Sequence, residues 1–143
     1  VMARGPAAEI FSGARGSIPA LGGENWLRGV VVEDGREGAR VDLGGTIVVT
    51  PRLARAKGDT VVLALPAEDV LLARGEIHGT SARNILAGRV VSLDEADDAI
   101  DVIVATPVEL RARVTRAAVS ELALAPGSRV WLLVKANAFR VAG

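Results

Sequence analysis

Residues 25–29, Asn-Trp-Leu-Arg-Gly, and residues 84–88, Asn-Ile-Leu-Ala-Gly, share the pattern Asn-x-Leu-x-Gly at an interval of 59 residues (84 − 25). A second pair of similar stretches, Gly-Asp-Thr-Val-Val-Leu at 58–63 and Gly-Ser-Arg-Val-Trp-Leu at 127–132, recurs after 69 residues (127 − 58). The second copy is therefore ten residues longer in its middle (69 − 59). A repeat of this length indicates two similar half-domains.

Around the repeats, short runs of Val, Ile and Leu alternate with Gly, Asp and Pro, which is typical of a small all-β barrel. The expected strands are 26–33, 39–43, 46–50, 60–65, 69–73, 84–93, 100–106, 108–114, 129–135 and 139–141. Two short helices are expected at 51–56 and 116–122, the second after an N-cap at Thr115. Hairpin turns are predicted at Asp34-Gly35 and Gly44-Gly45, because Gly accepts positive φ. The pattern predicts an all-β fold of two tandem OB-like β-barrel half-domains with short helices.

We expect residues 1–18 to be a linker, with a short helical turn at 7–11, residues 19–75 to be the first half and residues 76–143 the second. The chain starts at Val1 without a charged-then-apolar leader, so we expect a piece of a longer chain. No apolar stretch is long enough to span a membrane.

The composition of the 143 residues excludes several classes of protein. The chain has no Cys, which removes disulfide frameworks and cysteine-based zinc sites. Its formal net charge is zero and its aromatic content is 3%, which argues against nucleic acid as a partner. It has no phosphate loop of the Gly-Lys-Ser/Thr type, and one His gives no Ser-His-Asp arrangement. We therefore expect no enzyme activity from this chain.

Three segments of the second half offer hydrogen-bond donors without a carboxylate among them. Ser81 and Arg83 provide a hydroxyl and a cationic fork, and Thr115 places a hydroxyl at a predicted helix start. Lys135, one of two lysines in the chain, ends an apolar strand. Such a set suits a small dianion that carries only acceptor oxygens.

Each segment also has an ordinary structural interpretation. The polar residues before 84 form a turn in which Asn84 caps its own backbone. Thr115 is then a plain N-cap, and Lys135 extends to solvent from a strand end. We interpret the lone His78 as an exposed turn residue and the acidic residues 94–98 as a solvated hairpin loop.

The second half resembles a known family. The residues that carry the resemblance are Thr-Ser-Ala-Arg-Asn at 80–84 with Leu86 and Gly88, Val114-Thr115 with Glu121-Leu122, Pro126-Gly127, and Val134-Lys135-Ala136. They look like the molybdate-binding Mop (molbindin, TOBE-type) domain. Residues 1–11 and 61–72 resemble segments of molybdate ABC-transporter ATPase subunits. The whole chain is therefore similar to the C-terminal regulatory part of such a subunit.

The resemblance implies that the ligand is molybdate or tungstate, with no cofactor, held in a pocket at an interface between Mop units. It also implies a homodimer, with the sites at the subunit interface or at the interface between lobes. The residues that it implies for the oxyanion site are Ser81, Ala82, Arg83, Thr115, Ala118, Lys135 and Ala136. Ala118 stands where the family often has Ser, so only its backbone N–H would remain as a donor. In the first copy Glu24 and Pro66 stand in the places of Arg83 and Lys135, and we expect that half to be structural.

The resemblance further implies a cytoplasmic protein, peripheral to the inner membrane through a permease, that mediates feedback inhibition of transport. Two alternatives stay open: a free-standing oxyanion storage protein, and a dimerisation or interaction module of an ABC ATPase without a ligand. The Ser-Ala-Arg-Asn segment at 81–84 and Lys135 are the residues that separate these alternatives.

Overall fold

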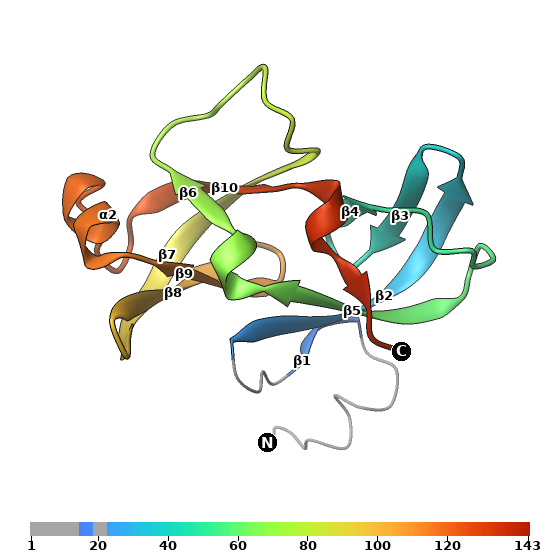
Figure 1. Ribbon diagram of the computed structural model, residues 1–143, viewed down its shortest axis with the longest axis horizontal. Coiled ribbons are helices and arrows are strands. Elements are labelled where there is room, and N and C mark those ends of the chain that lie inside the picture. Colours follow the sequence, from blue (N-terminus) through green and yellow to red (C-terminus); the bar gives the residue numbers. More distant parts are fainter. Residues whose placement is uncertain (1–14, 19–22) are drawn as a thin grey trace.

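The computed structural model describes residues 15–18 and 23–143, and it confirms the all-β prediction (Figure 1). Two antiparallel sheets lie side by side, and within these ranges one short α-helix packs at one end. The expected helical turn at 7–11 lies outside the described residues. No helix in the described ranges has the length and apolar character needed to cross a membrane.

The first sheet has the strand order β11-β5-β2-β3-β4, with β1 paired to β2. Its strands are β1 (Gly16–Ile18), β2 (Glu24–Gly35), β3 (Gly38–Asp42), β4 (Ile47–Thr50), β5 (Thr60–Pro66) and β11 (Arg140–Val141). β1 belongs to the segment expected to be a linker; its three residues instead pair with β2 at 26–28.

The second sheet has the strand order β6-β10-β7-β8-β9. Its strands are β6 (Leu71–Ala73), β7 (Asn84–Ala96), β8 (Ala99–Ala105), β9 (Glu109–Val114) and β10 (Arg129–Val134). The helical segments are the 3-10 turns η1 (Ala67–Asp69) and η2 (Ala136–Ala138) and the helix α2 (Arg116–Glu121). The acidic loop expected at 94–98 is the tip of the β7–β8 hairpin.

The two halves exchange their last strands. After β5, the chain passes through η1 into β6, which pairs with β10 of the second sheet. After β10, it passes through η2 into β11, which pairs with β5 of the first sheet. The buried side chains of both sheets form one continuous core. Two barrels that would each have a small core therefore share one, which removes more apolar surface from water.

The repeated Gly of the Asn-x-Leu-x-Gly pattern is required by close strand packing in both halves. A Cβ atom on Gly29 would lie 2.4 Å from Cγ1 of Val41, and one on Gly88 would lie 2.6 Å from Cγ1 of Val104. The repeated Leu packs on the core in both copies: Leu27 is 1% exposed, and Leu86 is partly buried against this core. The pattern therefore encodes the same packing twice.

The prediction of a helix at 51–56 is wrong. The Asp34 carboxylate accepts hydrogen bonds from the backbone N–H groups of Leu53 (3.1 Å) and Arg55 (2.8 Å), and these residues form a loop. The hydroxyl of Thr50, which could have capped a helix there, donates instead to the next carbonyl at 2.8 Å. The Asp34 carboxylate in β2 therefore accepts the hydrogen bonds of backbone N–H groups that would otherwise be free to bond an N-cap side chain.

The hairpin turn predicted at Asp34-Gly35 is also misplaced. β2 continues to Gly35, which pairs with Gly38, so the turn consists of residues 36 and 37. The turn predicted at Gly44-Gly45 is confirmed, because both glycines have positive φ, at 94° and 116°.

Candidate functional site

A pocket of ≈ 420 Å³ opens beside the end of β10, where the loop before β7 meets the two 3-10 turns. In Figure 1 this loop rises above β10, and η1 and η2 lie below and beside it. The residues that line the pocket are Glu68, Asp69, Leu71, Thr80, Ser81, Ala82, Leu133, Lys135, Asn137 and Ala138. They come from both halves of the sequence, because strand exchange places η1 next to β10.

The pocket brings together Ser81, Ala82 and Lys135 of the predicted oxyanion residues. Lys135 follows the last residue of β10, and within the described ranges its ammonium group has no hydrogen-bond or ion-pair partner. Ala136 is the first residue of η2, so its backbone N–H has no partner within that helical turn. The hydroxyl of Ser81, the ammonium of Lys135 and this N–H are donors available to a ligand.

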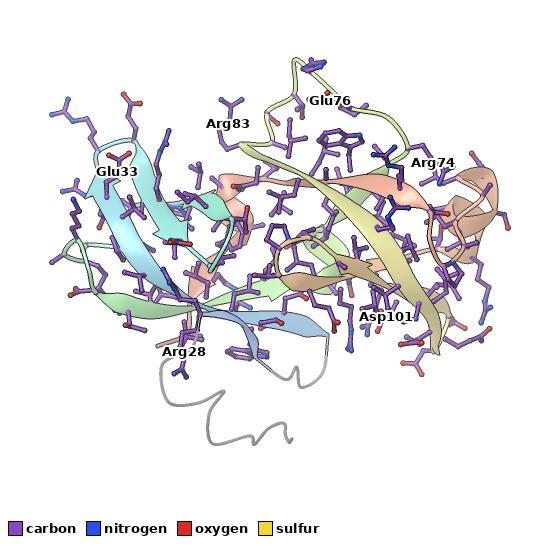
Figure 2. The ribbon with its side chains drawn as sticks, turned by 180° about the vertical axis from the view of Figure 1, so that it is seen from behind. Arg28, Glu33, Arg74, Glu76, Arg83 and Asp101 are labelled. Atoms are coloured by element: carbon purple, nitrogen blue, oxygen red, sulfur yellow. The ribbon has the colours of Figure 1, made fainter. Side chains whose placement is uncertain are left out.

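Arg83 stands next to the pocket but does not line it. Its guanidinium turns back onto its own loop, where Nη2 donates to the carbonyl of Thr80 (2.9 Å) and Nε to that of Ser81 (3.4 Å). Figure 2 shows Arg83 extending outward from the start of β7. The N–H of Ala82 is also occupied, since it donates to the hydroxyl of Thr80 at 3.1 Å. Some of the hydrogen-bond donors of this loop are therefore already paired with acceptors in the same loop.

Thr115 and Ala118 lie elsewhere in this chain. Thr115 is the N-cap of α2, as predicted, and its hydroxyl accepts the N–H of Ala118 at 3.0 Å. That N–H is thus not free for a ligand, contrary to the expectation from sequence. Figure 1 places α2 at one end of the second sheet, away from η2, and neither residue lines the pocket.

Two carboxylates line the pocket, which the donor segments did not predict. Glu68 and Asp69 belong to η1, and only the passage of the chain from β5 into β6 brings them there. The pKa of Arg113 is raised, chiefly by its hydrogen bonds to Asp101 and to a smaller extent by Glu68. Glu68 and Asp69 therefore add negative charge to the pocket that Lys135 lines.

Asn84 does not cap its own turn, and the prediction that it does is wrong. Its side chain is buried, and Nδ2 donates to the carbonyls of Val49 (2.9 Å) and Val134 (3.2 Å). Its Oδ1 accepts the N–H of Val49 at 2.7 Å. Asn84 therefore connects β4 of the first sheet to the start of β7 and the end of β10.

The first half has the same connection but a different charge pattern. Asn25 bonds both backbone groups of Arg111 in β9 and the carbonyl of Leu65, as Asn84 does with β4 and β10. Glu24 forms an ion pair with Arg140, and Glu24 also pairs in register with Pro66. Where the second half offers unpaired donors, the corresponding acidic residue of the first half is neutralised by Arg140, which strand exchange brings into the first sheet.

Two antiparallel sheets that exchange their terminal strands, with a donor-bearing pocket where they join, are consistent with tandem TOBE/Mop half-domains. Residues 80–141 match the TOBE domain family. The chain is 34% identical, over 96% of its length, to the molybdenum import ATP-binding protein ModC 1 of Azotobacter vinelandii. It is 33% identical, over 94% of its length, to ModC of Aromatoleum aromaticum (strain DSM 19018 / LMG 30748 / EbN1).

The chain spans 40% and 37% of the lengths of these two relatives and matches their C-terminal regions. Among solved structures it is similar to the cytoplasmic molybdate-binding protein ModG in a crystal form with molybdate bound. The TM-score is 0.72 at 29% identity, over 86% of this chain and 98% of ModG. The resemblance to the molbindin and ModC families stated from sequence is confirmed.

Proposed function

We propose that this chain binds molybdate or tungstate and forms the regulatory part of a molybdate-import ATP-binding protein. The observation that carries the proposal is that Ser81 and Lys135, from distant segments of the second half, line one pocket. The similarity to ModC proteins and to the molybdate-binding ModG supports the same ligand class.

The chemistry of the donors fits a compact tetrahedral dianion. Such an ion accepts hydrogen bonds at all four oxygens and must be met by charge-assisted donors when it leaves water. The Lys135 ammonium supplies the charge, while the Ser81 hydroxyl and the Ala136 N–H supply direction. Arg83 adds a second cation when its guanidinium rotates from its own loop carbonyls toward the ligand.

The carboxylates of Glu68 and Asp69 oppose this ion. They stand in the pocket with Lys135, so a bound dianion experiences repulsion as well as attraction. We infer that they limit affinity.

Thr115 and Ala118 can join the site only from a second copy of the chain, because α2 lies away from the pocket within one chain. We propose a homodimer in which α2 of one copy approaches the pocket of the other. An oxyanion held between copies would stabilise the arrangement that binds it better, and this difference in affinity is the basis for regulation. The parent protein would act in the cytoplasm, on a membrane permease.

Isothermal titration calorimetry with molybdate, tungstate and sulfate tests the proposal. Molybdate and tungstate are nearly equal in size, so they should bind with similar affinity. Sulfate offers the same four acceptor oxygens in a smaller ion and should bind more weakly. Absence of heat with every oxyanion, or equal affinity for sulfate, would contradict the proposal.

A dimerisation module without a ligand is the second candidate. Leu71, which is 62% exposed, lines the same pocket as Glu68 and Asp69, and an apolar and acidic rim suits a protein surface. Under this alternative, sedimentation would show a dimer that Leu71→Asp disrupts, while calorimetry would show no oxyanion binding.

A further inference from the structure

We propose that Asn84 is the positioning residue that holds the two sides of the oxyanion pocket at a fixed separation. This inference rests on the proposed function of the pocket. Asn84 does not line the pocket and is 4% exposed, so it acts through the backbone that it bonds.

One side of the pocket is fixed through covalent continuity. Asn84 follows Arg83 directly, and the loop that ends there contains Ser81 and Ala82. Because the Asn84 side chain is fixed by hydrogen bonds on two sides, the last residues of this loop have little freedom to move away from β10.

The other side is fixed through the carbonyl of Val134. Nδ2 of Asn84 donates to this carbonyl at 3.2 Å, and the two residues are also partners in the β7–β10 register. Lys135 follows Val134, so the bond sets the point at which the lysine leaves the sheet. A single amide group therefore spans the two segments that supply the donors.

The same amide ties the pocket to the other half of the molecule. Its remaining bonds go to the N–H and the carbonyl of Val49, in the edge strand β4 of the first sheet. η2, which carries Ala136, also contacts β4. Displacement of β4 would therefore reach the Ser81 and Lys135 sides of the pocket through Asn84.

Asn25 provides a matched control within the chain. It makes the same three kinds of bond, to both backbone groups of Arg111 and to the carbonyl of Leu65, and it is equally buried at 4% exposed. Its neighbours are Glu24 and Pro66 instead of Arg83 and Lys135. A purely structural role predicts equal consequences for the two asparagines.

The experiment compares Asn84→Ala with Asn25→Ala in the full 143-residue chain. Urea denaturation should show similar destabilisation, since equivalent bonds are lost. Tungstate affinity by calorimetry should fall about tenfold or more in Asn84→Ala, as for outer-shell residues of metal sites. It should change less than about twofold in Asn25→Ala, because distant, independent sites act separately. Equal losses of affinity, or none in Asn84→Ala, would overturn the inference.

Hydrogen exchange separates this inference from the proposed function. Without any ligand, the hydrogen-bonded backbone amides of Ala82 and Ala138, one on each side of the pocket, should exchange faster in Asn84→Ala than in wild type, and remain unchanged in Asn25→Ala. If wild type binds no tungstate, the proposed function fails, and the exchange data still decide whether Asn84 orders the pocket. If either Ala variant does not fold, the pair Asn84→Ser and Asn25→Ser, which keeps a short hydroxyl, is compared in the same way, with the same outcomes.

Discussion

The first and second halves of the molecule share a scaffold and differ in the residues attached to it. The side chains of Asn25 and Asn84 each form hydrogen bonds with an edge strand of the opposite sheet. Gly29 and Gly88 each allow close strand packing. The residue before each Asn differs, however. Glu24 is ion-paired in the first half, and its counterpart in the second half, Arg83, is a cation beside a pocket. The repeat therefore encodes the fold, and the departures from the repeat encode the candidate site.

The loops after β4 and β9 show the same separation. Thr115 caps α2 after β9, whereas Asp34 draws the residues after β4 into a loop without a helix. The difference arises because the β2–β3 hairpin places a carboxylate next to those amides. A local sequence that is compatible with a helix is thus overruled by a residue from another strand.

The largest expected effect is on the free energy of unfolding. It tests whether close strand packing at the repeated Gly matters equally in both halves. Gly29→Ala and Gly88→Ala should each lower the free energy of unfolding by about 3 kcal/mol, because the new methyl group overpacks against a neighbouring valine and a backbone carbonyl. Urea denaturation measures both values. Gly75→Ala, where a Cβ meets no atom within 4 Å, is the control. A large effect in one half alone would show that the scaffold is not shared.

The next largest effect is on ligand affinity, and it tests Lys135, for which the first half has Pro66. Lys135→Ala should weaken tungstate binding about 30-fold, or about 2 kcal/mol, the value of a hydrogen bond to a charged group. Calorimetry measures the affinity. Lys57→Ala removes the other lysine, which does not line the pocket, and should leave the affinity unchanged. Equal losses in the two variants would show that the site is misplaced.

A smaller effect of opposite sign concerns the acidic contribution of η1 to the pocket. Glu68→Gln and Asp69→Asn should each raise tungstate affinity about threefold, since each removes a repulsion that solvent partly screens. The same titration measures this change, with Glu37→Gln in the β2–β3 turn as the control. Weaker binding in either variant would mean that the carboxylates organise the site instead of limiting it.

The smallest effect concerns the loop that replaces a helix in the first half. Hydrogen bonds from the backbone N–H groups of Arg55 and Leu53 hold the pKa of Asp34 below its usual range. The folded state therefore binds the proton less readily than the unfolded state, so this contribution is present at neutral pH and is lost as the pH falls through the folded pKa, below about pH 4.

Urea denaturation between pH 7 and pH 3 tests this linkage. Asp34→Asn should reduce the dependence of stability on pH, and Asp98→Asn in the β7–β8 turn should not. An unchanged pH dependence in Asp34→Asn would contradict the role assigned to this carboxylate.

Much of the fold follows from the sequence, because strands and turns depend on local patterns. The alternation of apolar residues predicts the strands, and the position of Thr115 predicts the start of α2. The missing helix at 51–56 could not be predicted, since its cause, Asp34, is distant in sequence. The strand exchange is equally non-local, because nothing in the runs around 71 and 140 identifies their partners.

The pocket could be predicted only in part for the same reason. Ser81 and Lys135 carry recognisable chemistry, and they meet because β7 and β10 are neighbours. Glu68 and Asp69 enter through the strand exchange, so a search for donor-rich segments misses them. Asn84 has the sequence signal of a turn residue, and its bonds to Val49 become visible only when the two sheets are placed together.

The proposed function requires that an oxyanion occupies the pocket between Ser81 and Lys135. A crystal of the chain soaked in tungstate tests it most directly, because anomalous scattering from tungsten marks the ion without ambiguity. We expect one strong peak in each such pocket, within hydrogen-bond distance of the Lys135 ammonium. A peak confined to another surface, such as the hollow beside Arg74 and Arg129, would contradict it.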